Sequence, residues 1–150
     1  MTFAKGTCVS SERSQRELKQ MLVKHGARAV VMGEDIPTGD AFVEFFVDGL
    51  RARLMMQMPT HDQYARTPGG KKRNRVAQQS VWEQGCKERW RAMVRVVNAK
   101  LVAVEAGITT VEHEFMADIV LADGRRLAEH VQPQITEARQ TPIALPAGRG

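Results

Sequence analysis

The sequence predicts one α+β domain in which helices pack on one side of a three-stranded antiparallel sheet. Three observations carry this prediction: a long helical repeat of apolar residues over 76–106, a strand–turn–strand pattern over 41–59, and a helical repeat over 11–25. We expect an N-terminal helix, a three-stranded antiparallel sheet, a long amphipathic helix and two short C-terminal helices. A chain of 150 residues with no dividing linker suits a single domain, 1–150, with 1–10 and 140–150 as flexible tails.

The first helix should begin at Ser10 or Ser11 and end near His25. Serine is a favoured N-cap residue, apolar side chains recur on one face of this segment, and Gly26 suits the position just past the end. The β-prone run ARAVVM, residues 27–32, then gives the first strand.

The second and third strands come from a hairpin. Side chains alternate along FVEFFV, and Asp48-Gly49 is a strong signal for a two-residue turn. Arg51 and Arg53 alternate with apolar neighbours, so the return strand should have one polar face.

The segment from Val76 to about Ala106 predicts one long helix that ends at Gly107. Its apolar residues form a continuous stripe, which we expect to cover the sheet: Trp82, Cys86, Trp90, Met93, Val97, Leu101 and Val104. Both tryptophans are therefore expected in the core and not on a base-stacking surface, which argues against tight single-strand binding.

Two short helices should follow the long one. Thr109 with Glu112 forms a capping box for a helix that contains Val111, Phe115 and Ile119. A last short helix, around 127–139, is begun or interrupted by Pro133.

Positive charge is concentrated in one part of the chain. Residues 66–100 carry a balance of +8, whereas 1–65 sum to zero and 101–150 to −3, for a total of +5. This segregation predicts a positive face, which suits a phosphate-rich or otherwise acidic partner.

Within that segment, four cations occupy five positions directly after Gly69-Gly70 and before the long helix. The first amides of a helix and the positive end of its dipole attract anions, and glycine allows a close approach. The helix continues the charge at one-turn spacing, about 6 Å, which is close to the phosphate repeat of a nucleic-acid strand. We therefore expect a site for DNA or RNA made of seven residues: Lys71, Lys72, Arg73, Arg75, Lys87, Arg91 and Arg95.

Two alternatives compete with this interpretation. The cations could form only the solvated face of an amphipathic helix with a basic loop, or they could contact an acidic protein. If the loop binds anions, its cations should be exposed and without a packed conformation when no ligand is present.

Other classes of function have less support. Cys8 and Cys86 are too few and too far apart for a disulfide framework, which favours a reduced, cytoplasmic setting. The sequence lacks an apolar run of about 20 residues and an N-terminal secretory signal, so we expect a soluble protein without a membrane partner.

We predict no catalytic residue, no cofactor and no metal, and we favour a non-enzymatic function. No phosphate-binding loop, dinucleotide fingerprint or Cys-x-x-Cys pair occurs. His61-Asp62, the pair Glu44 and Asp48, and His113 between two glutamates all lack a third partner at a convincing spacing.

Two resemblances to known proteins appear. The order helix–three strands–helix, with GGKKRNRVA before the second helix, resembles the double-stranded RNA-binding domain. In that family a basic motif at this position contacts phosphates, and Lys71, Lys72 and Arg75 would occupy its basic positions, with Asn74 in place of an alanine.

The segments ELKQMLVKHGARAVV, FVEFFVDGLRARLMMQMP, AEHVQPQI and the long stretch from ERWRAMV to VLADGR resemble short proteins of unassigned function encoded by phages and prophages. That resemblance implies a bacterial host cytoplasm and phage DNA replication or recombination as the context. The alternative in the same context is a host-directed, inhibitor-type protein that uses the basic loop and helix face against an acidic host protein.

Overall fold

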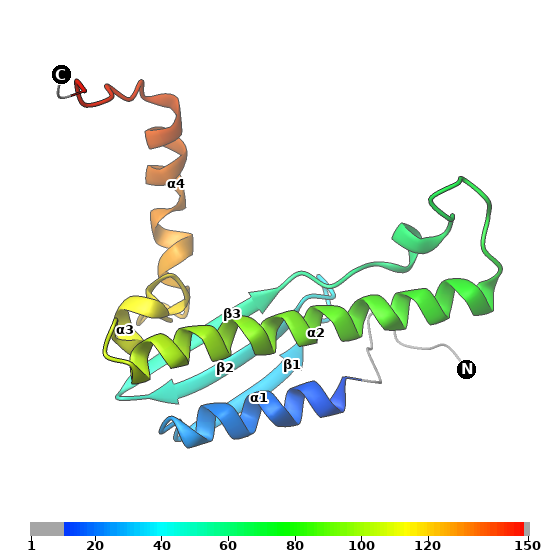
Figure 1. Ribbon diagram of the computed structural model, residues 1–150, viewed down its shortest axis with the longest axis horizontal. Coiled ribbons are helices and arrows are strands. Elements are labelled where there is room, and N and C mark those ends of the chain that lie inside the picture. Colours follow the sequence, from blue (N-terminus) through cyan, green and yellow to red (C-terminus); the bar gives the residue numbers. More distant parts are fainter. Residues whose placement is uncertain (1–10, 149–150) are drawn as a thin grey trace.

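A computed structural model describes residues 11–148 and confirms the α+β order (Figure 1). The main elements, in chain order, are α1 (Glu12–Lys24), β1 (Ala29–Glu34), β2 (Ala41–Val47), β3 (Leu50–Met56), η1 (His61–Tyr64), α2 (Arg75–Glu105), α3 (Val111–Glu114), η2 (Met116–Asp118) and α4 (Leu127–Gln140). Of the two expected tails, 1–10 lies outside the described residues, and 142–148 has neither helix nor strand.

The three strands form one antiparallel sheet with β2 in the centre. The turn between β2 and β3 is the expected one, because Asp48 and Gly49 both have positive φ, 50° and 77°. Phe45 lies opposite Val30 on one side and Ala52 on the other. This register sends one alternate set of side chains toward the helices and the other set to the opposite face.

The helices α1 and α2 lie on the same face of the sheet, where the core forms (Figure 1). From the sheet, Val43 and Phe45 are buried, and Leu18 and Leu22 enter from α1. From α2 the expected stripe is confirmed: Trp82, Cys86, Trp90, Val97 and Leu101 are buried, and Met93 and Val104 are partly buried. Val94 is an additional buried residue of α2.

The two helices of this layer run in the same direction, with α1 beside the C-terminal half of α2 (Figure 1). Their C-terminal ends are joined by His25 and Glu105, whose Nε2 and Oε2 atoms lie 3.4 Å apart. The N-terminal half of α2 packs instead on the segment after β3, where the indole N–H of Trp82 donates to the Pro59 carbonyl at 2.9 Å.

The C-terminal part differs from the expectation in detail. The helix expected around Val111–Ile119 is one turn, α3, capped by the Thr110 hydroxyl, which accepts from the His113 N–H. Phe115 leaves this turn to make an edge-to-face contact with Phe45, with ring centroids 5.2 Å apart. Ile119 then forms an antiparallel β-bridge with Ala52 of β3. This pairing with the edge strand of the sheet ends the helical segment.

The last helix, α4, is confirmed, and Pro133 lies inside it without interrupting it. None of its residues is buried, and Figure 1 shows it projecting from the rest of the molecule. No helix in the described part of the chain combines the length and the apolar character needed to cross a membrane.

The expectation that the cysteines are reduced thiols is wrong for Cys86. Cys86 is buried on α2 and is disulfide-bonded, whereas the sequence favoured reduced thiols. The other cysteine, Cys8, lies outside the described residues. Because disulfides persist mainly in oxidising compartments, this bond weighs against the reduced setting inferred from the sequence.

Candidate nucleic-acid interface

A hollow of about 430 Å³ lies between the first turn of α1 and the middle of α2. Three of the predicted cations line it, namely Lys87, Arg91 and Arg95. Arg13 from α1 is a fourth, and the remaining lining residues are Ser14, Gln84 and Glu88. We call the four cations Arg13, Lys87, Arg91 and Arg95 the basic groove.

The geometry of α2 explains why three of these cations lie together. Lys87, Arg91 and Arg95 are four positions apart, so they lie one above another on a single face of the helix. Trp90 and Val94 are buried on the neighbouring face. Packing of that apolar face fixes the rotation of α2 and holds the three cations at its solvent-exposed edge.

Arg13 was not expected in the site. It lies about 80 positions from Arg91 and Arg95 in the sequence and reaches them only because α1 packs along α2. Arg13 and Ser14 belong to the first turn of α1, so the positive end of that helix dipole faces the same hollow.

The charge of the basic groove is not neutralised within the described residues. None of its four cations forms an ion pair with a described partner, although other arginines do, for example Arg51 with Glu44 and Arg126 with Asp118. Among the described residues that line the hollow, Glu88 is the single acidic one. Like charges in a concave surface raise the local positive potential and attract anions.

The loop that carries the other predicted cations is a small hydrogen-bonded hairpin. Thr67 donates its N–H to the Lys71 carbonyl at 2.8 Å, and the Thr67 hydroxyl accepts from the Lys71 N–H at 3.1 Å. Gly70 has φ +88°, which a side chain would disfavour, and Arg66 forms a β-bridge with Lys72. The expectation that this loop lacks a packed conformation is therefore wrong.

Within the hairpin, Arg73 differs from its neighbours. It is partly buried, and its guanidinium donates to the carbonyls of Tyr64 at 3.1 Å and Arg66 at 2.8 Å. These bonds hold the two sides of the loop together. The remaining cations of the cluster, Lys71, Lys72 and Arg75, are exposed as expected.

The structure does not merge the loop and the basic groove into one cluster. Arg75 and Lys87 are twelve positions apart on α2, which is about 18 Å at 1.5 Å per residue. In Figure 1 the loop lies beyond the N-terminal end of α2, and α1 lies beside its other half. The two sets of cations are thus arranged along one helix.

The weaker catalytic candidates do not converge. Glu44 is occupied by two arginines, His61 stacks on Trp82 with ring centroids 4.0 Å apart, and His130 pairs with Asp123 at 2.9 Å. No group of three or more histidine, cysteine, aspartate or glutamate side chains in residues 11–148 is arranged to hold a metal ion.

Comparison with known proteins gives no relative: no family model, no curated protein and no solved structure matches this chain.

Proposed function

We propose that this protein is a small accessory protein that binds nucleic acid through the phosphate backbone, with the basic groove as its principal contact. The observation that carries the proposal is four cations, from two helices, that line one hollow and form no ion pair with any described residue. Phosphate oxygens are the acceptors that arginine and lysine bind most readily in such a setting.

The exposed cations of the loop form a second contact, at the N-terminal end of α2. From Arg75 to Arg95 the helix rises by about 30 Å and turns by about 200°, so one nucleic acid reaches both sets of cations only if it contacts two sides of α2. If loop and groove contact one duplex, about four to six phosphates are neutralised, and log affinity should fall against log salt with a slope of about −4 to −5. Contacts to phosphates carry no base information, so different sequences should bind alike.

The experiment is fluorescence anisotropy with single- and double-stranded DNA and RNA at several salt concentrations. Arg91→Ala with Arg95→Ala should weaken binding to all sequences and reduce the slope by about 2. Lys71→Ala with Lys72→Ala should act in the same direction. Arg73 is left intact because it holds the loop together.

A matched control removes the same charge elsewhere. Arg16→Ala with Lys19→Ala takes two exposed cations from the outer side of α1, which does not line the basic groove. This control should leave the slope close to that of the wild type. Unchanged affinity at low salt in both test variants would refute phosphate binding at these residues.

The biological setting is part of the same proposal. Its support is the resemblance to phage-encoded proteins, which implies a role in phage DNA replication or recombination in a bacterial cytoplasm. Binding to an acidic host protein in place of nucleic acid would leave the anisotropy unchanged and appear in copurification from host extract.

A further inference from the structure

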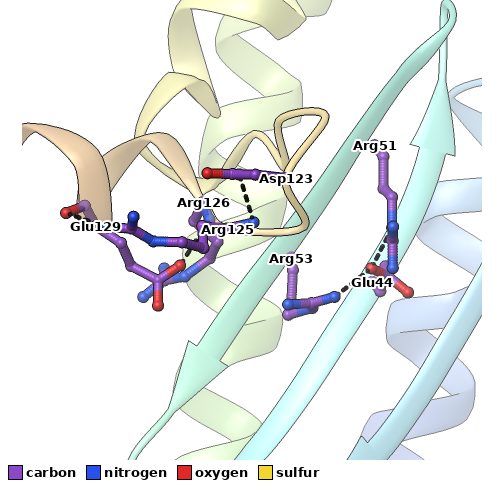
Figure 2. A network of polar contacts seen from close by, with 7 residues as sticks. All are labelled: Glu44, Arg51, Arg53, Asp123, Arg125, Arg126 and Glu129. Atoms are coloured by element: carbon purple, nitrogen blue, oxygen red, sulfur yellow. Dashed lines mark hydrogen bonds and ion pairs between the residues drawn. The ribbon is translucent and has the colours of Figure 1, made fainter.

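The face of the sheet opposite α1 and α2 is the second surface with unusual chemistry. Along β2, Val43 and Phe45 point into the core, so Phe42, Glu44 and Phe46 point to the other side. Figure 2 looks onto that side, with α1 and α2 behind the strands and α4 to the left of them. No helix in residues 11–148 packs over it, and we call it the open face. Val31 on β1, opposite Glu44, is 47% exposed there.

A charged trio lies at the centre of the open face (Figure 2). Oε1 of Glu44 accepts from Nε of Arg51 at 2.6 Å and from Nη2 of Arg53 at 3.1 Å. Glu44 is 8% exposed, whereas the side chains of both arginines remain accessible. One carboxylate is thus shared by two guanidinium groups, so the trio keeps a net positive charge and holds both planar groups in fixed positions.

Aromatic rings lie on both sides of this trio. Phe46 is opposite Arg51 in the β2–β3 register, and the guanidinium carbon of Arg51 lies 5.9 Å from the ring centroid. Phe42 is opposite Gly33 on β1, and its ring lies so close that a Cβ at Gly33 would be 2.9 Å from Cζ. Both phenylalanines are partly exposed, and they lie four positions apart, about 13 Å along a strand.

We propose that the open face is a stacking platform for unpaired bases of single-stranded nucleic acid. Aromatic rings and guanidinium planes on a sheet are surfaces on which splayed bases stack, and the surplus cation suits a polyanion. A duplex does not present its base faces and should not use this surface. The open face and the basic groove lie on opposite sides of the sheet, so the two proposals stand independently.

The same observations disfavour a second copy of the chain as the occupant. Two sheets that pack face to face exclude water from their centre. Here the centre of the face is an ion trio, and burying such a group costs more than burying an apolar one. A base can stack on the rings at either end while the trio keeps contact with solvent.

The first test is a fluorescent reporter, Phe46→Trp, in the full chain. The native tryptophans, Trp82 and Trp90, are 2% and 3% exposed, so they cannot be reached by a base. Single-stranded oligothymidine, or its RNA counterpart, should quench the new indole, and a duplex of equal length should not. No change at saturating single strand would refute the proposal, as would a signal that depends on protein concentration alone, which indicates self-association.

The second test removes the rings but keeps an apolar surface. Phe42→Leu with Phe46→Leu should weaken single-strand binding by about 5- to 100-fold and leave duplex affinity and its salt slope unchanged. Val31→Ala, which trims the same face without removing a ring, is the matched control. Wild-type single-strand affinity in the folded double variant would overturn the proposal. The variant Arg91→Ala with Arg95→Ala tests the basic groove separately. If it loses duplex binding but keeps the quenching of the new indole by single strands in the Phe46→Trp background, the open face binds independently of the groove.

Discussion

The inward and outward faces of α2 differ in what they contribute to the protein. The inward face carries residues that are almost fully buried, among them Trp90 at 3% and Val97 at 0% exposure. The outward face carries Lys87, Arg91 and Arg95, which are exposed. Like charges four positions apart destabilise a helix by about 0.2–0.5 kcal/mol per pair. Folding therefore explains the inward face, whereas the outward charges do not stabilise the helix and are the residues to which we assign the proposed contact with nucleic acid.

The two faces of α2 should differ most in the cost of removing a side chain, and Trp90 is the position where this cost is largest. Trp90→Ala should lower the free energy of unfolding by about 3–5 kcal/mol, because it removes a large buried side chain and leaves a cavity. Arg91→Ala, one position away on the exposed face, should change it by less than about 0.5 kcal/mol. Urea unfolding followed by circular dichroism measures both. Equal losses in the two variants would show that the outward face is also structural.

A substitution on a third side of α2, the side that faces η1, should lower the unfolding free energy by an intermediate amount. A Cβ at Gly85 would overlap the hydroxyl of Tyr64 and lie 2.9 Å from its Cζ atom. Gly85→Ala should therefore cost about 1–3 kcal/mol in unfolding free energy, although alanine normally favours a helix. Adding Tyr64→Phe to this variant should recover part of the loss, since it removes the overlapping oxygen. A stabilised Gly85→Ala protein would mean that η1 moves away without cost.

The smallest predicted effect concerns Asp118, a partly buried residue of η2. Burial raises the pKa of Asp118 above 3.8, and the charges of Arg126 and Lys100 offset this only in part. The folded state then binds the proton more tightly than the unfolded state, which stabilises the fold below pH 3.8. This stabilisation is lost as the pH rises through the raised pKa.

This effect is measured by comparing the unfolding free energies of the wild type and of Asp118→Asn between about pH 3.5 and about pH 7. The asparagine variant should gain stability relative to wild type as the pH rises, and the difference should level off above the raised pKa. A difference that moves in the opposite direction would mean that the ion pair with Arg126 outweighs burial.

Much of the fold follows from local patterns. The helical repeat that runs into Gly107 and the Asp48-Gly49 turn place α2 and the β2–β3 hairpin close to where they are found. Trp82 and Trp90 are in the core because their spacing puts them on one side of a helix, which is a property of the sequence alone. The exposure of Lys87, Arg91 and Arg95 follows from the same spacing.

The remaining features depend on contacts between distant segments. Arg13 joins the basic groove only because α1 packs along α2, and Phe115 ends α3 early because its ring packs against Phe45. Arg73 looked like a phosphate ligand, yet the folded loop offers it two carbonyls. The open face exists because both helices cover the same side of the sheet. Periodicity determines which side of an element is apolar, but which elements meet is decided by how the whole chain buries its apolar surface.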